Sequence, residues 1–264
     1  MDLSIFTQNN FFLMLALDHR QSFLNLIVNN QDPIQIKKQI IKSLSNQFSG
    51  ILLDTQFGLP AYNSLNISQP YLLAIEKSGF IENNGDRIIE IEHQVIDLKN
   101  MGASGIKLLI YFNSQSKTAV NQLETAKKVF TDCRQNNLPL FLEIVTYNVG
   151  DDSNQVYQSV KMFLDNDIVI DVFKLEYPGS PENCQKITKL LGDTPWILLT
   201  KSNDFSIFSS QLKIAITGGC RGFLAGRALW QEYPKMTNPQ DQLEFITNTL
   251  PQRFKEITKI VLSS

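Results

Sequence analysis

Short apolar runs alternate with longer amphipathic segments along the whole chain. The runs are rich in β-branched and aromatic residues, which predicts buried β-strands. The longer segments place apolar residues three or four positions apart, the spacing of one helix face. Strands are predicted over residues 11–18, 50–54, 71–76, 105–112, 139–146, 171–178, 195–200 and 222–226. Helices are predicted over residues 33–48, 118–136, 154–164, 181–191, 205–217 and 239–261, and one more ends near residue 100.

Eight strands separated by helices are typical of the α/β class with a closed (β/α)8 TIM barrel. Such a barrel commonly has about 250 residues. Residues 1–264 are therefore predicted to form a single barrel domain, sealed by the C-terminal helix. The third unit is the least regular, because residues 65–70 form no clear helix before its strand and residues 82–86 are a polar turn.

Composition and charge narrow the classes of function. The 24 Lys and Arg residues against 26 Asp and Glu give a net charge of -2, which provides no basic field for a nucleic acid. No apolar run reaches about 18 residues, so no membrane partner is expected. Cys133, Cys184 and Cys220 show no CxxC spacing and are expected to be reduced thiols. We therefore expect a cytoplasmic protein.

Ionisable residues lie inside or at the end of five predicted strands. They are Asp18, Asp54, Lys107, Glu143 and Lys174. In a (β/α)8 barrel the carboxyl ends of the strands surround the catalytic mouth. We therefore expect several of these side chains to converge.

Lys174 lies in the middle of the apolar run DVFKLEYP. Side chains alternate along a strand, so Lys174 and Glu176 point to the opposite face from Phe173 and Leu175. Either orientation of the strand leaves a polar residue that needs an explanation. Alone, Lys174 is more typical of a strand lysine that extends outward or pairs with an acid. However, Lys107 and Glu143 lie within the two preceding strands, and three such charges are costly unless they compensate one another. Together they favour a functional site.

Two neighbouring ammonium groups lower each other's pKa, and burial acts in the same direction. One of the two lysines can therefore be neutral near physiological pH, and a neutral lysine is a nucleophile. Schiff-base formation with a ketone is the chemistry that matches it, because the iminium accepts electrons when a carbon–carbon bond breaks. A nearby carboxylate can move the protons, and Glu143 fits that role.

Seven segments, in order along nearly the whole chain, carry a resemblance to a known family. They are LALDHR, GILLDTQFGLPA, GIKLLIYF, LFLEIV, DVFKLEYP, PWILLT and GFLAGRALW. The chain resembles the class I tagatose-1,6-bisphosphate aldolases and the sulfofructosephosphate aldolases. The resemblance implies a (β/α)8 barrel that cleaves a ketose phosphate to dihydroxyacetone phosphate and an aldehyde through a lysine Schiff base.

The resemblance also implies roles for four residues. Lys174 matches the Schiff-base lysine of the family, and Glu143 matches its acid/base glutamate. Lys107 matches a second active-site lysine, and Asp18 matches the aspartate after the first strand.

The segment FLAGRALW places Gly226 and Arg227 directly after the eighth strand. Backbone N–H groups and a guanidinium at this point can bind a phosphate, and barrels often bind phosphate there. The alternative is that Gly226 only makes a tight turn and Arg227 pairs with an acid.

The chain departs from the family pattern at two places. His19 stands where the family has a glutamine, and Thr200, Lys201 and Ser202 stand where it has a loop of the Ser-Ser-Gly type. Thr200 and Lys201 are candidates for phosphate binding, although a surface role for Lys201 is equally compatible with the sequence. The end groups of the substrate therefore stay open.

Three further residues are candidates for substrate contacts. Arg20 can hold Asp18 or a phosphate. Asp54 and Gln56 can contact substrate hydroxyls or position Lys107, and their alternative role is to cap the turn after the second strand.

Neither a metal nor a cofactor is predicted. The chain has only two histidines, and the sequence shows no His/Cys/Asp cluster at the spacing of metal ligands. The expected partner is a small sugar phosphate, and the amphipathic C-terminal segment is a candidate interface of a homo-oligomer. Two alternatives stay open for the function. One is a non-catalytic sugar-phosphate regulator on the same barrel, and the other is a Schiff-base lyase with a different carbonyl substrate.

Overall fold

The computed structural model describes residues 1–148, 154–201 and 204–263. Eight parallel strands within these residues close into a barrel. They are β2 (Phe11–Leu17), β3 (Gly50–Leu53), β4 (Tyr71–Ala74), β7 (Gly105–Phe112), β8 (Leu140–Thr146), β9 (Val172–Leu175), β10 (Trp196–Leu198) and β11 (Gly222–Ala225). The strands pair in this order, and β11 pairs back onto β2. The predicted (β/α)8 fold is confirmed.

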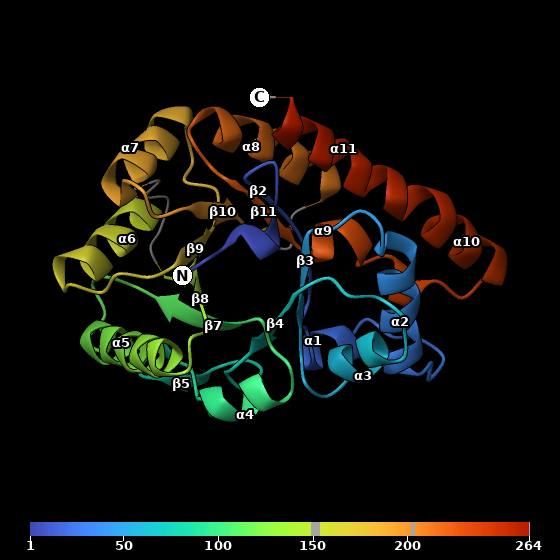
Figure 1. The fold of residues 1–264 in the computed structure, drawn as a ribbon, viewed down its shortest axis with the longest axis horizontal. Helices are drawn as coiled ribbons and strands as arrows, with labels where there is room; N and C mark the ends of the chain where they lie inside the picture. Colours follow the sequence, from blue (N-terminus) through green and yellow to red (C-terminus); the bar gives the residue numbers. More distant parts are fainter. Residues whose placement is uncertain (149–153, 202–203, 264) are drawn as a thin grey trace.

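Helices surround the strands (Figure 1). The longer ones are α2 (Pro33–Leu44), α5 (Ala119–Gln135), α6 (Gln155–Asp165), α7 (Pro181–Leu191), α8 (Phe205–Thr217) and α11 (Leu250–Leu262). The shorter ones are α1 (Gln21–Leu24), α3 (Gly58–Asn63), α4 (Val95–Asn100), α9 (Arg227–Trp230) and α10 (Pro239–Glu244). None of the helices in the described part of the chain is long and apolar enough to cross a membrane.

Local sequence explains where several helices begin. Proline occupies the first turn of α2, α7 and α10, where its missing N–H leaves no hydrogen bond unmade. The residues before these prolines are Asp32, Ser180 and Asn238, and each side chain accepts a hydrogen bond from a backbone N–H of the first turn.

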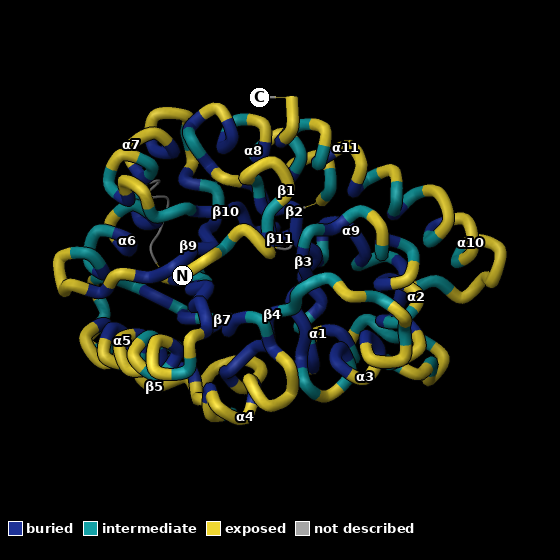
Figure 2. The backbone as a smooth tube through the Cα atoms, viewed as in Figure 1, coloured by how far each residue is buried: buried dark blue, intermediate teal, exposed yellow. Residues whose placement is uncertain are grey.

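Two apolar layers lie on either side of the barrel wall. The inner layer includes Phe12, Met14, Phe141 and Val172, and the outer layer fills the space between strands and helices. Figure 2 shows the strands of the barrel mostly buried, whereas the outer helix surfaces are exposed. Phe6, in the 3-10 turn η1 (Ser4–Phe6), packs edge to face on Phe141 with ring centroids 5.3 Å apart. The segment before β2 therefore contributes to the inner core.

The structure differs from the predicted elements at a few places. The predicted helix over residues 33–48 ends at Leu44, and the one over residues 239–261 is interrupted by a π-helical turn at Phe245–Thr249. The polar turn at residues 82–86 is the tip of a hairpin of β5 (Ile81–Asn83) and β6 (Asp86–Ile88). Asn84 and Gly85 both have positive φ there, as a tight hairpin turn requires. The sequence predicts no clear helix at residues 65–70 before the third strand. The structure has one earlier, α3, which spans Gly58–Asn63.

Gly222 lies at the start of β11 with φ of +124°, and a Cβ at this position would lie 2.1 Å from the carbonyl oxygen of Phe12. We expect Gly222→Ala to destabilise the barrel by about 3 kcal/mol or more, because backbone strain and a backbone clash add. Gly192→Ala is the matched control, since Gly192 also has positive φ but open space around it. Its expected cost is about 1 kcal/mol. Urea unfolding compares the two, and similar losses would contradict the assigned clash.

Candidate active site

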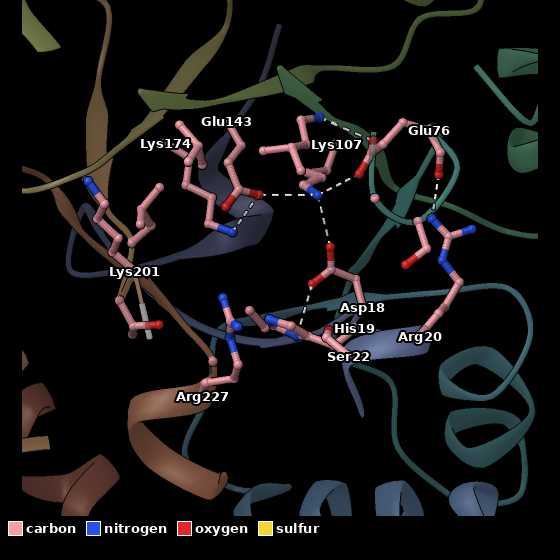
Figure 3. Close-up of a pocket in the computed structure, with 18 of the residues that line it drawn as sticks. Asp18, His19, Arg20, Ser22, Glu76, Lys107, Glu143, Lys174, Lys201 and Arg227 are labelled. Carbon is pink, nitrogen blue, oxygen red and sulfur yellow. Dashed lines mark hydrogen bonds and ion pairs between the residues drawn. The ribbon is translucent and has the colours of Figure 1, made fainter. Parts of the chain in front are cut away.

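A cavity of about 580 Å³ opens at the carboxyl ends of the barrel strands. Its charged lining residues come from seven different loops or strands (Figure 3). They are Asp18, Arg20, Glu76, Lys77, Lys107, Glu143, Lys174, Lys201 and Arg227. The cavity therefore gathers most of the ionisable residues that the sequence places at strand ends.

Lys174 points into the barrel. Val172, two residues earlier on β9, belongs to the inner apolar layer, whereas Phe173 and Leu175 belong to the outer layer. Lys174 is 4% exposed, and its Nζ lies 2.8 Å from Oε2 of Glu143. The two residues are direct partners in the register of β8 and β9, so the sheet itself places them side by side.

Lys107 binds three carboxylates. Its Nζ lies 2.9 Å from Oδ2 of Asp18, 2.6 Å from Oε1 of Glu76 and 3.1 Å from Oε2 of Glu143. Burial alone would lower the pKa of Lys107, but the three negative charges outweigh burial and hold this pKa well above its usual value. The expectation that the two lysines lower each other's pKa is therefore wrong for Lys107, which is a fixed cation.

Glu143 connects the two lysines through one oxygen atom. Burial raises the pKa of Glu143, and the neighbouring Lys174 and Lys107 lower it by more, so the net shift is downward. The pKa of Asp18 is also lowered, because the charge of Lys107 outweighs the effect of burial. Both side chains are thus carboxylates at neutral pH.

Glu76 is a site residue that the sequence analysis missed. Its side chain is 3% exposed, and besides Lys107 it accepts a hydrogen bond of 3.1 Å from the backbone N–H of Leu109. Glu76 follows the apolar run of β4 as Asp18 follows that of β2, so its position was a usable signal. The irregularity of the third unit obscured it.

Arg20 lines the cavity but has partners on the β4 side. One guanidinium nitrogen pairs with Glu92, and another donates to the backbone carbonyl of Glu76. Arg20 thereby connects the loop after β2 to the segment after β4. This contact differs from both predicted roles, which were a bond to Asp18 or to a phosphate.

His19 has a buried Nδ1 without a hydrogen-bond partner. Its ring packs edge to face on Trp230, with centroids 5.2 Å apart. Burial lowers the pKa of His19 to about 3; Asp18 opposes this shift, and the positive charge of Arg227 adds to it. His19 is therefore a neutral imidazole at physiological pH.

The predicted phosphate-binding residues lie together at one side of the cavity. Arg227 has no ion pair or hydrogen bond among the described residues, and its buried Nε has no partner. A Cβ on Gly226 would lie 3.2 Å from the carbonyl oxygen of Ala16, so a larger residue would crowd this turn. Lys201 has φ of +43° and pairs with Glu176 at 2.9 Å, while its side chain stays 54% exposed. Thr200 lines the same side, and Ser202 lies outside the described residues.

Asp54 and Gln56 do not line the cavity. Asp54 accepts hydrogen bonds from the backbone N–H groups of Gln56, Phe57 and Gly58 at the start of α3. This is the turn-capping alternative, and it corrects the expected contact with substrate hydroxyls.

Asp54 also pairs with Lys37, a fully buried residue of α2 that the sequence analysis did not single out. Lys37 donates two hydrogen bonds of 2.8 Å to the carbonyl oxygens of Leu17 and His19. These bonds flank Asp18 on both sides, so Lys37 holds the backbone that carries this carboxylate. Lys37 lies four residues before the buried Ile41 and therefore on the apolar face of α2. A lysine on that face could have been recognised in the sequence as a buried charge.

No group of three or more His, Cys, Asp or Glu side chains able to hold a metal occurs in the described ranges. The three cysteines are buried and free. Burial raises the pKa of Cys133 to about 12 and that of Cys184 to about 11, so these thiols are not nucleophiles at neutral pH.

Comparisons with known proteins identify relatives along most of the chain. The family profile described as DeoC/LacD family aldolase matches residues 12–232. A tagatose 1,6-diphosphate aldolase of Staphylococcus epidermidis is 27% identical, and the match covers 84% of this chain and 82% of the relative. A tagatose 1,6-diphosphate aldolase of Staphylococcus aureus is 28% identical, with 82% and 79% covered.

Solved structures share the fold. An archaeal fructose 1,6-bisphosphate aldolase has a TM-score of 0.73 at 20% identity, covering 99% of this chain and 98% of that one. A second archaeal fructose-1,6-bisphosphate aldolase, described with its catalytic Lys covalently bound to the carbinolamine intermediate of the substrate, has a TM-score of 0.70 at 19% identity. It covers 96% of this chain, and 97% of that chain is covered in return.

The lowered pKa of His19 predicts a loss of stability in mild acid. A histidine in the unfolded chain takes up a proton near pH 6.5, whereas folded His19 does so only near pH 3. Below pH 6.5 the unfolded state therefore gains a proton that the folded state lacks, and at pH 5 this costs about 2 kcal/mol.

His19→Gln should remove this dependence. We expect the free energy of unfolding, measured with urea at pH 7.5, 6.5 and 5, to fall less steeply in the variant than in the wild type. The lowered pKa of Asp18 changes the free energy of unfolding only below about pH 4, so it does not contribute between pH 7.5 and pH 5. Parallel curves for the two proteins would refute the assignment of a neutral His19.

Proposed function

Because the chain belongs to the DeoC/LacD aldolase family, we propose that it is a class I aldolase that cleaves a phosphorylated ketose through a Schiff base on Lys174. The observation that carries the proposal is the pair of Lys174 and Glu143, 2.8 Å apart in a cavity at the barrel mouth. Dihydroxyacetone phosphate and an aldehyde would be the products.

In the proposed cycle Lys174 attacks the ketone carbon as the free amine, and Glu143 accepts the proton that Lys174 gives up. The attacking nitrogen passes one proton to the former ketone oxygen and Glu143 returns the other, so this oxygen leaves as water and yields the iminium. The C3–C4 bond breaks, its electrons flow into the iminium, and the proton of the C4 hydroxyl passes to the Glu143 carboxylate. Protonation of the enamine at C3 and hydrolysis of the iminium then release the triose phosphate.

The other charged residues support this chemistry without a covalent role. Lys107 neutralises the carboxylates around the reacting carbon and offers an ammonium N–H to a substrate hydroxyl. Asp18 and Glu76 fix Lys107 from two sides. Arg227, Lys201, Thr200 and Gly226 would hold the phosphate, and such remote binding energy can align the scissile bond.

Borohydride trapping tests the nucleophile. Incubation with dihydroxyacetone phosphate and sodium borohydride should add a reduced adduct to Lys174, located by peptide mass spectrometry. Lys174→Met should give no adduct and no turnover, yet it should fold, because Glu143 keeps its ion pair with Lys107. Lys107→Met is the matched control and should still carry an adduct on Lys174. An adduct on Lys107, or full activity of Lys174→Met, would refute the proposal.

Glu143→Gln tests the proton relay. The amide keeps the size of the side chain but cannot accept a proton, so we expect the trapping rate and turnover to fall by about 10² or more. Saturable binding of dihydroxyacetone phosphate without any adduct in the wild type would instead favour a sugar-phosphate-binding regulator.

A further inference from the structure

The two sides of the cavity differ in charge. Strands β4 and β10 lie four strands apart in either direction around the barrel, so the residues that follow them face each other across the mouth. Figure 3 shows Lys201 to the left of Lys174, Glu76 and Arg20 to its right, and Arg227 below it. A ketose bound through its carbonyl to Lys174 would extend one end toward each side.

The β10 and β11 side can bind a phosphate. Arg227 has no ion pair or hydrogen bond among the described residues, whereas the half-exposed Lys201 ammonium pairs with the buried Glu176 at 2.9 Å. A guanidinium without a carboxylate partner is free to bind a dianion, so Arg227 is the group that distinguishes this side.

The β4 side offers no such cation. Lys77 pairs with Glu90 at 3.2 Å, and Arg20 pairs with Glu92. Arg87 lies outside the cavity lining, with its guanidinium 4.6 Å from the ring centre of Phe80. Arg20 and Lys77 are thus each paired with a carboxylate, whereas Arg87 packs on an aromatic ring outside the cavity lining.

The segment behind this side carries excess negative charge, although Glu76 is the only one of its acids that lines the cavity. The segment from residue 76 to residue 92 contains five acidic residues, and Lys77, Arg87 and the adjoining Arg20 are the cations beside it. The acids are Glu76, Glu82, Asp86, Glu90 and Glu92. A second phosphate placed here would meet net repulsion. The stretches outside the described ranges, residues 149–153, 202–203 and 264, contain no Lys or Arg in the sequence.

Neutral and polar residues complete the lining next to this side. Ser78 and Gly79 follow β4, and Gln21, Ser22 and Asn25 follow β2, midway between β4 and β10 around the barrel. Hydroxyl and amide groups donate and accept hydrogen bonds and therefore suit the hydroxyls of a sugar.

We propose that the substrate is a ketose 1-phosphate whose far end is an uncharged polyol. The inference rests on the proposed function and specifies the substrate class of that site. Cleavage of the C3–C4 bond moves the proton of the C4 hydroxyl to C3 by way of the site, and gives dihydroxyacetone phosphate and an unphosphorylated hydroxyaldehyde. No oxidant or further reactant is needed. The chain would thus differ from the relatives named as aldolases of a 1,6-diphosphate.

The condensation reaction tests the inference. Consumption of dihydroxyacetone phosphate is followed with three aldehyde pairs: glycolaldehyde, racemic glyceraldehyde and erythrose, each with its phosphate ester. We expect kcat/KM to favour the unphosphorylated member by about tenfold or more, and added salt to reduce this preference because it screens the repulsion. Equal or greater activity with the esters, or no condensation with any unphosphorylated aldehyde, would overturn the inference.

Glu90→Gln sharpens the test. Glu90 is exposed and its loss frees Lys77, so the preference against the esters should fall at least about threefold, while activity with unphosphorylated aldehydes is kept. Glu124→Gln, which makes the same charge change on the exposed face of α5, should leave the preference unaltered. An unchanged preference in Glu90→Gln would count against the charge argument.

The borohydride adduct separates the two proposals. If Lys174 is trapped with dihydroxyacetone phosphate but the esters are preferred, the aldolase assignment stands and the substrate inference fails. If no adduct forms on Lys174, both fail.

Discussion

The site depends on a single carboxylate oxygen that two lysines share. Oε2 of Glu143 lies 2.8 Å from Nζ of Lys174 and 3.1 Å from Nζ of Lys107. Two ammonium groups cannot lie this deep in a barrel without negative charge between them. Asp18 and Glu76 complete the compensation on the far side of Lys107. The result is an asymmetric pair, in which Lys107 is held by three carboxylates and Lys174 by one.

This asymmetry suits different roles for the two lysines, with Lys107 as a fixed positive charge and Lys174 as the reactive amine. A lysine with three anionic partners keeps its proton and organises the site. A lysine with one partner has a single contact to exchange when it attacks a carbonyl. The parallel register of β7, β8 and β9 produces the arrangement, because it places Lys107, Glu143 and Lys174 on neighbouring strands with inward orientation. The closed barrel then keeps their backbones rigid, which catalytic geometry requires.

The surroundings of the site are organised by polar groups that bind the backbone of the loops around the cavity. Lys37 holds the carbonyl oxygens on both sides of Asp18 and pairs with Asp54, which in turn caps α3. Arg20 connects the loop after β2 to the segment after β4. That segment carries the hairpin and the acidic residues that give the mouth its uneven charge. The supporting contacts and the charge distribution of the mouth thus belong to the same loops.

The sequence by itself determined the barrel, most strand positions and the three central charges, because apolar runs and side-chain alternation are local patterns. Residues 105–112, 181–191 and 205–217 were predicted with the bounds that the structure gives. Only the tertiary structure decided which charge meets which. Lys107 pairs with Asp18, 89 residues away, and with Glu76, 31 residues away, and no local pattern records such distances. The same holds for Lys37 and Asp54, whose buried pairing arises only when β3 lies against β2 and Lys37 of α2 reaches the ends of both strands. Barrel closure brings these groups together, and their mutual distances then set each pKa.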